Sequence, residues 1–223
     1  MKRDEKQLNV KNKMVGIYLS GGLSKRMGRP KLDLQLGDSY LGTWGLQAAL
    51  QSDLERIVVV INPDHVNVWL RPLENHPKIE VVPCSNSYEG QAESLKAGVK
   101  HIDSSCEAFM ILLADQPFVS VDHLNLLIRK FHEYKNQNAA CTFAASIHEA
   151  VPRPPIIFDI AAAEDIQTLH GDRGAKSLLQ QYEQHGIWLE NKDLWNFLDV
   201  DTVEDYKLAA EYIRTPKLQK GGE

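Results

Sequence analysis

Short runs of apolar residues alternate with longer amphipathic stretches along most of the chain. The apolar runs predict buried strands at Met14–Leu19, Ile57–Ile61, Ile79–Val82, Phe109–Leu113 and Ala139–Ala145, with weaker strand patterns at Pro155–Phe158, Gly186–Glu190 and Trp195–Leu198. The amphipathic stretches predict helices at Leu41–Ser52, His65–Leu73, Gln91–His101, Val121–Tyr134, Ala175–Gln184 and Val203–Arg214. Strands that are apolar throughout and alternate with helices are typical of a mostly parallel sheet covered on both faces. We therefore expect an α/β three-layer sandwich.

The length of the chain, 223 residues, suits one sizeable hydrophobic core. The sequence predicts a single domain over residues 13–214, flanked by solvated tails at residues 1–12 and 215–223. The stretch Glu149–Pro155 contains three prolines, and we expect an irregular crossing there between two halves of the domain.

Composition and charge narrow the range of functions. Hydrophobic residues at 43% and charged residues at 25% are ordinary for a soluble globular protein, and no apolar run is long enough to span a membrane. A net charge of −5 disfavours a nucleic-acid partner. The three cysteines contain no CxxC pair, which disfavours a zinc site or a disulfide framework. Free thiols and a polar N-terminus without an apolar leader predict a cytoplasmic protein.

A glycine-rich segment, Ser20–Gly22, directly follows the first predicted strand, which ends at Leu19. Ligands of open α/β sheets bind beyond the carboxyl ends of the strands. Glycines there let backbone N–H groups approach phosphate oxygens, and Arg26 and Lys31 follow within reach. The segment matches neither GxxxxGK[ST] nor GxGxxG, which disfavours a Walker-type ATPase and a dinucleotide fold. The residues predict a polyphosphate site, with a flexible turn carrying two solvated charges as the alternative.

Two acidic segments follow predicted strands. Asp115 comes after Phe109–Leu113, at the sheet edge that also carries the glycine-rich segment, where a carboxylate can hold a hard divalent cation. Asp201 lies just before the helix predicted at Val203–Arg214. A turn or helix-capping role is the alternative for each aspartate, and capping by Asp201 or Thr202 is compatible with a metal-binding role for Asp201.

The segment from Gly22 to Lys31 reads Gly-Leu-Ser-Lys-Arg-Met-Gly-Arg-Pro-Lys. It is similar to Gly-x-Ser-x-Arg-Met-Gly-x-x-Lys, the signature of the NTP-transferase superfamily that includes the molybdenum cofactor nucleotidyltransferases. The resemblance extends over residues 14–206, nearly the whole globular part. It implies a Rossmann-like sandwich of the kind found in nucleotide-diphospho-sugar transferases.

The resemblance also implies roles for individual residues. Catalytic roles fall on Arg26, Lys31 and Asp115. The nucleotide-binding residues implied are Leu19, Ser20, Gly21, Gly22, Ser24, Arg26, Lys31, Gln91 and Ser94. Mg²⁺, with Mn²⁺ as the alternative, would be held by Asp115 and Asp201. The acceptor-binding residues implied are Pro155, Gly171, Asp172 and Gly174, although the residues alone are equally compatible with a tight turn and an Asp cap at 171–174.

By the same resemblance, the reaction is transfer of a nucleoside monophosphate from CTP or GTP to the phosphate of molybdopterin, with release of pyrophosphate. The start of the loop, Ser20–Gly22, resembles the guanylyltransferase branch. The segments around Asp115, Gly171 and Asp201 resemble the cytidylyltransferase branch that serves molybdenum hydroxylases such as xanthine dehydrogenase, and they favour CTP. The alternatives are a guanylyltransferase for the same cofactor, a transferase for other phosphate acceptors, and a delivery protein that hands the cofactor to an apo-hydroxylase.

Overall fold

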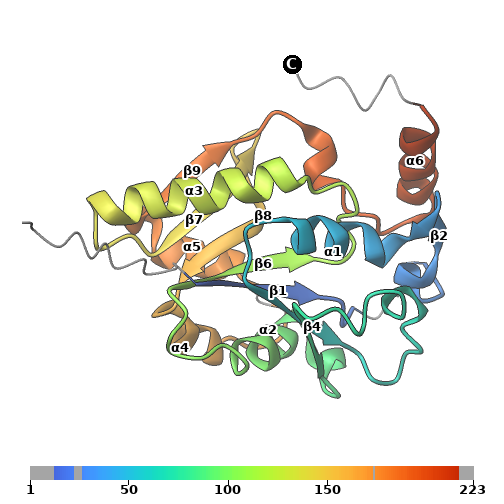
Figure 1. Cartoon of the computed structure of the whole chain (residues 1–223), viewed down its shortest axis with the longest axis horizontal. Helices are drawn as coiled ribbons and strands as arrows, with labels where there is room; N and C mark the ends of the chain where they lie inside the picture. The colour runs from blue at the N-terminus through green and yellow to red at the C-terminus, as the bar shows by residue number, and fades with distance from the viewer. Residues whose placement is uncertain (1–12, 23–26, 173, 216–223) are drawn as a thin grey trace, which may run out of the picture.

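The computed structural model of the chain describes residues 13–22, 27–172 and 174–215. The predicted tail at 1–12 and, apart from residue 215, the predicted tail at 215–223 lie outside the described residues. Within these ranges, a seven-stranded sheet has the order β5-β4-β1-β6-β8-β7-β9 (Figure 1). Its strands are β1 (Met14–Leu19), β4 (Arg56–Ile61), β5 (Ile79–Pro83), β6 (Ala108–Leu113), β7 (Phe143–His148), β8 (Val151–Asp159) and β9 (Gly186–Glu190). Every neighbouring pair is parallel except those that β8 makes with β6 and β7. The predicted mostly parallel sheet is confirmed.

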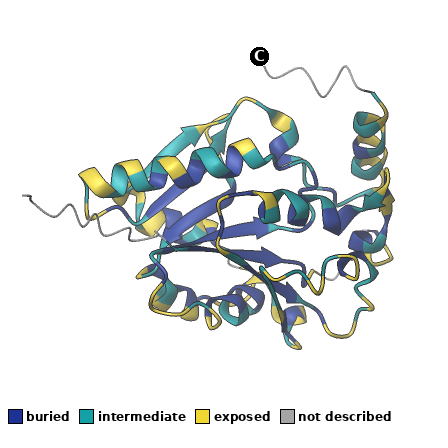
Figure 2. Ribbon diagram, viewed as in Figure 1, coloured by how far each residue is buried: buried dark blue, intermediate teal, exposed yellow. Residues whose placement is uncertain are grey.

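Helices cover both faces of this sheet, which confirms the three-layer sandwich (Figure 1). The helices are α1 (Leu41–Gln51), α2 (Gln91–Val99), α3 (Val121–Gln137), α4 (Ala162–Gln167), α5 (Lys176–Gln181) and α6 (Val203–Arg214). One core lies between the sheet and α1, α3 and α6, and the other lies between the sheet and α2, α4 and α5. Strand β1 serves both cores because alternate residues face opposite sides: Tyr18 packs into the first and Ile17 into the second. Figure 2 shows the strands buried between the two helical layers.

The proline-rich stretch Glu149–Pro155 is not an irregular crossing, and that prediction is wrong. Glu149 and Ala150 form a tight turn with positive φ, and β8 begins at Val151. The register between β7 and β8 shifts by a bulge, so that the paired residues run from Ala145↔Ile156 to Ser146↔Arg153 and pass over Pro154 and Pro155. Proline lacks a backbone N–H and is tolerated in strands at such bulges, which explains how a strand accommodates this sequence.

Two further predictions of secondary structure are wrong. Residues 195–198 are not a strand, because a 3₁₀ helix spans Leu194–Phe197 and the Asp193 side chain caps it by accepting a hydrogen bond from the Trp195 N–H at 3.1 Å. Residues 65–73 are not a regular helix either. They contain a 3₁₀ turn, Val68–Leu70, preceded by Asn67 in the left-handed conformation, which interrupts helix formation.

Smaller differences concern the ends of elements. The fifth strand lies three to four residues further along the chain than predicted, at Phe143–His148, α5 is shorter than predicted, and α4 was not predicted. A short hairpin, β2 (Gln35–Leu36) with β3 (Ser39–Tyr40), precedes α1. In the part of the chain that the structure describes, no helix is long and apolar enough to cross a membrane.

Candidate active site

The carboxyl ends of β1 and β6 bring the glycine-rich segment and Asp115 together. The two strands pair in parallel up to Leu19↔Leu113, and the Ala114 N–H then donates to the Leu19 carbonyl at 3.0 Å. The two loops therefore begin at the same edge of the sheet. The loop after β1 and Asp115 share one edge, as the sequence predicts for ligand sites of open α/β sheets.

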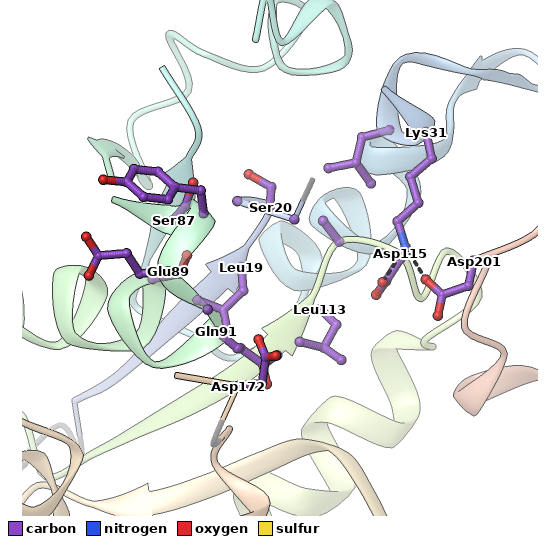
Figure 3. A pocket seen from close by; sticks show the side chains of 17 residues that line it. Leu19, Ser20, Lys31, Ser87, Glu89, Gln91, Leu113, Asp115, Asp172 and Asp201 are labelled. Carbon is purple, nitrogen blue, oxygen red and sulfur yellow. Dashed lines mark hydrogen bonds and ion pairs between the residues drawn. The ribbon is translucent and has the colours of Figure 1, made fainter. Parts of the chain in front are cut away.

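A cleft of about 500 Å³ opens at this edge (Figure 3). Its described lining consists of Leu19, Ser20, Gly21, Gly22, Lys31, Leu32, Ser87, Tyr88, Glu89, Gly90, Gln91, Ser94, Leu113, Ala114, Asp115, Asp172 and Asp201. These residues come from the ends of β1 and β6, the start of α2 and three loops distant in sequence.

Ser20 and Gly21 fix the floor of the cleft. Both the backbone N–H and the hydroxyl of Ser20 donate to the Val60 carbonyl, at 3.0 and 2.7 Å, which ties the loop to β4. A Cβ on Gly21 would lie 2.7 Å from Ser94 Oγ and 3.1 Å from Ser87 Cβ. Only glycine allows the loop to lie this close to the start of α2.

Lys31 joins two carboxylates on the opposite side of the cleft. Its Nζ donates to Asp115 Oδ2 at 2.7 Å and to Asp201 Oδ1 at 2.6 Å, as the dashed lines in Figure 3 mark. Burial disfavours the charged ammonium, but the charges and hydrogen bonds of the two aspartates outweigh it and raise the pKa of Lys31 above its ordinary value. Lys31 is therefore a cation at neutral pH.

The position of Asp201 is set by the start of α6 and by the loop of Asp115. The Val200 N–H donates to the Asp115 carbonyl at 2.9 Å. The Thr202 hydroxyl accepts from the Asp205 N–H at 3.1 Å, while the Asp205 carboxylate accepts from the Thr202 N–H at 2.8 Å and the Asp201 N–H at 3.1 Å. This capping box confirms Thr202 as the helix cap and leaves the Asp201 side chain to face Lys31.

Gly171 and Gly174 pack against the start of α2. The Ala92 N–H donates to the Gly171 carbonyl at 3.0 Å. A Cβ on Gly90, whose φ is 130°, would lie 2.3 Å from the Gly171 carbonyl carbon, and a Cβ on Gly174 would lie 2.1 Å from Gln91 Oε1. Glycine is therefore needed at position 90, where the clash is with backbone atoms, and Asp172 lines the cleft.

The structure brings most of the predicted site residues into this one cleft. The predicted residues that line it are Leu19, Ser20, Gly21, Gly22, Lys31, Gln91, Ser94, Asp115, Asp172 and Asp201. Gly171 and Gly174 contact lining residues without being lining residues themselves. Pro155 is buried in β8 and does not line the cleft. Ser24 and Arg26 lie outside the described residues.

Ser87 is a lining residue that the sequence analysis did not identify. It is 7% exposed, and its Oγ is buried without a hydrogen-bond partner among the described residues. A buried hydroxyl that faces a cleft without a partner is suited to bind a polar ligand group. The sequence signal that would have indicated Ser87 is its position three residues before Gly90, the N-cap of α2.

The pair Asp115 and Asp201 fits a hard divalent cation. The Lys31 ammonium sits between the two carboxylates and marks a position where a cation contacts both. The described ranges contain no group of three or more His, Cys, Asp or Glu residues that could hold a metal ion. Two carboxylates nevertheless suffice for Mg²⁺, which is commonly bound through one or two carboxylates together with substrate phosphates and water.

A comparison with protein-family models shows the family to which the chain belongs. The model of the MobA-like NTP transferase domain matches residues 16–186. The chain belongs to the MobA-like NTP transferase family. It is accordingly a nucleotidyltransferase.

Proteins and solved structures that are similar to this chain match almost its whole length. "Purine catabolism protein PucB" of Bacillus subtilis (strain 168) is 34% identical over 202 residues, which cover 87% of this chain and 95% of PucB. "Probable molybdenum cofactor guanylyltransferase" of Geobacillus sp. (strain WCH70) is 23% identical over 202 residues, covering 87% and 97%. A solved structure of Rv0371c from Mycobacterium tuberculosis H37Rv in complex with manganese has the same fold, with a TM-score of 0.67, 20% identity and coverage of 90% and 98%.

Proposed function

We propose that this MobA-like enzyme transfers CMP from CTP to the phosphate of molybdopterin, with Mg²⁺ bound by Asp115 and Asp201. The observation that carries the proposal is the meeting of Lys31, Asp115 and Asp201 beside the glycine-rich floor of the cleft. The names of PucB and of the Geobacillus relative support molybdopterin as the acceptor. A molybdenum hydroxylase such as xanthine dehydrogenase acts in purine catabolism and requires the molybdenum cofactor, so the two names point to the same product. Delivery of the product to such an apo-hydroxylase belongs to the proposal.

The reaction is an in-line displacement. An oxygen of the acceptor phosphate attacks the α-phosphorus, a new P–O–P linkage forms, the bond from the α-phosphorus to the β-phosphate bridge breaks, and pyrophosphate leaves. Lys31, held as a cation, is placed to neutralise phosphate oxygens, and positioning of the reactants supplies the remainder of the catalysis. No covalent intermediate with the protein is needed.

The charge of the cleft supports a requirement for a divalent cation. The described lining carries four carboxylates, Glu89, Asp115, Asp172 and Asp201, against the ammonium of Lys31. A triphosphate would be repelled by this arrangement without added positive charge. Asp115 and Asp201 would hold Mg²⁺, which would supply positive charge to offset the charge on the leaving pyrophosphate.

The choice of CTP rests on the segments around Asp115, Gly171 and Asp201, which resemble the cytidylyltransferase branch. Ser87 and Ser94 pack against Gly21 at the floor of the cleft. The unpartnered Ser87 Oγ is positioned to bind a polar edge of the base. Replacing Ser87 by Ala should raise KM for CTP roughly threefold to tenfold, the value of one net hydrogen bond, while Ser105→Ala on the exposed surface should leave it unchanged.

Transfer of GMP is the second candidate, and the name of the Geobacillus relative favours it. Pyrophosphate release measured with CTP, GTP, ATP and UTP, each with Mg²⁺ and molybdopterin, separates the two. We expect CTP to give the highest kcat/KM. A preference for GTP would replace the cytidylyltransferase assignment by a guanylyltransferase. Tight binding of molybdopterin without turnover of any triphosphate would instead support a delivery protein.

A further inference from the structure

We propose that Arg153 and Lys176 form a subsite for the phosphate monoester of the acceptor, on the side of Asp115 away from the glycine-rich loop. This inference rests on the proposed transfer to a phosphate acceptor and adds the residues that hold the acceptor's charge. The ligand class is a phosphate monoester dianion.

The topology of the sheet places Arg153 at the edge where Asp115 lies. Strand β8 is antiparallel to β6, and their last described pair is Ile111↔Ile156. Residues of β8 that precede Ile156 therefore extend past the carboxyl end of β6, towards the loop of Asp115. In the order β1-β6-β8, the glycine-rich loop, Asp115 and Arg153 follow one another along the same edge. A nucleotide over β1 and an acceptor over β8 would meet at Asp115.

Arg153 is linked to the loop of Asp115 through Asp199 and Gln116. Arg153 Nη1 lies 3.7 Å from Asp199 Oδ2, and Asp199 Oδ1 accepts a hydrogen bond at 2.9 Å from Nε2 of Gln116, the residue after Asp115. The Arg153 side chain is therefore held, through Asp199 and Gln116, next to the loop that carries Asp115.

The guanidinium of Arg153 has hydrogen-bonding capacity left for a ligand. A separation of 3.7 Å is an ion pair but too long for a hydrogen bond. Nε of Arg153 is buried and has no hydrogen-bond partner within the described ranges. Buried donors are nearly always paired, and guanidinium presents a planar set of donors that matches phosphate oxygens. If Arg153 served only to pair with Asp199, its Nε would be expected to donate a hydrogen bond within the fold.

Lys176 supplies a second positive charge at the same place. Although its side chain reaches solvent, partial desolvation and the charge of Arg153 lower the pKa of Lys176, and Asp199 only partly offsets this. Arg153 pairs with Asp199, and Lys176 lies near enough for the two positive charges to repel each other, so two cations face one carboxylate and a dianion is favoured. Lys176 begins α5, shortly after Gly174, which packs against Gln91 at the start of α2, so the subsite borders the nucleotide cleft.

Binding and kinetics of two charge-removing variants test this subsite. Arg153→Gln and Lys176→Gln should each raise KM for molybdopterin roughly tenfold to a hundredfold, as expected for loss of a charged hydrogen bond, with KM for CTP within about twofold of wild type. Arg153→Lys should recover part of the loss. Arg129→Gln and Lys130→Gln, on the exposed face of α3, are the matched controls and should change neither constant.

A second readout separates failure of the subsite from failure of the proposed function. Inorganic phosphate is titrated calorimetrically into the full chain preloaded with CTP and Mg²⁺, with no turnover required. Wild type should bind it and both Gln variants should bind it at least tenfold more weakly. Equal phosphate affinity in wild type and both variants overturns the subsite even if CMP transfer is observed. Weakened phosphate binding without transfer to molybdopterin retains the subsite and rejects the proposed acceptor.

Discussion

The two halves of the sheet contribute differently to the edge at which the cleft opens. Strands β5, β4, β1 and β6 are parallel, so they present only loops at the active edge: the floor after β1 and Asp115 after β6. In the other half, β8 runs in the opposite direction, so the beginning of a strand lies at that edge and brings Arg153 with it. Reversal of one strand thus lets a side chain from within the sheet face the loops of its neighbours.

The halves also differ in what holds them together. The parallel half is closed by close packing at two glycines: Gly90 lies against the backbone of Gly171, and Gly21 lies against the side chains of Ser87 and Ser94. The other half contains a buried polar group, His123, which joins α3 to β7. The Asp201 segment links the halves, through Val200 to the Asp115 carbonyl and through Asp201 to Lys31. Substitutions in each region should therefore have distinct effects.

The largest effect is expected where the halves meet. Lys31→Ala and Asp115→Asn should each lower kcat on the order of 10²–10³-fold, because each removes charge stabilisation at the transferring phosphate. Lys130→Ala, on the exposed face of α3, is the control for removal of a lysine. Steady-state pyrophosphate release with CTP measures the change. Turnover of Lys31→Ala or Asp115→Asn within about threefold of wild type would reject the assigned roles.

The next effect tests the backbone clamp of the parallel half. Gly90→Ala forces a Cβ to 2.3 Å from the Gly171 carbonyl carbon at a φ of 130°, which alanine adopts only with strain. The strain should cost about 1–3 kcal/mol or more, which lowers Tm by several degrees and raises KM for CTP. Gly22→Ala, where an added Cβ meets nothing within 4 Å, is the control for Tm. Equal Tm values for the two variants would show that the clamp is absent in solution.

The third effect is specific to the other half and depends on pH. Burial lowers the pKa of His123 from 6.5 to about 4. Asn191 donates to His123 Nδ1 at 3.0 Å, so the proton of the neutral ring is on Nε2, which donates to Ser146 Oγ at 2.8 Å. The stability that neutral His123 provides is complete above pH 6.5 and is lost as pH falls towards 4, by roughly 3 kcal/mol.

Urea unfolding at a series of pH values measures this loss. His123→Gln should remove most of the slope between pH 6.5 and 4, whereas His185→Gln, an exposed histidine, should retain it. If wild type and His123→Gln lose stability in parallel over that range, another group causes the acid sensitivity.

The smallest effect concerns the segment that links the halves. Thr202→Ala removes the hydroxyl that caps α6 and should destabilise the fold by about 1 kcal/mol, or about 2–4 °C in Tm. Because the capping box also fixes the backbone of Asp201, affinity for Mn²⁺ in the presence of CTP should fall as well. Thermal unfolding and Mn²⁺ titration measure the two effects. A loss of stability with unchanged Mn²⁺ affinity would reject the assignment of Asp201 as a metal ligand.

The parallel half could be predicted from the sequence because its strands are apolar throughout and separated by clear amphipathic helices. Asp115 and the glycine-rich segment were placed together by the rule that parallel strands end at one edge. Of β8, only the part at Pro155–Phe158 was predicted. The part that contains Arg153 was missed because its prolines are normally strand breakers, and the bulge that accommodates them is visible only once β7 is paired. Residues 195–198 were wrongly predicted as a strand because aromatic residues favour strands. In the structure, Trp195 instead stacks on Tyr212 of α6, with 3.8 Å between the ring centroids.

Contacts between loops distant in sequence were also beyond prediction. Asp172 was assigned to the acceptor pocket, and the structure shows it lining the same cleft as the glycine-rich floor, because Gly171 packs on Gly90. The bridge from Lys31 to Asp115 and Asp201 joins residues 84 and 170 positions apart. No local pattern encodes such a distance, and only the family resemblance indicated that the three residues act together.

The most direct test is the position of a cation in a complex of the chain with a non-hydrolysable CTP analogue and Mn²⁺, located by anomalous scattering from crystals. The expected result is a single strong peak between the carboxylates of Asp115 and Asp201, with Lys31 Nζ moved from them onto a phosphate oxygen. A bound nucleotide with the metal elsewhere, or with Lys31 still bridging both aspartates, would contradict it.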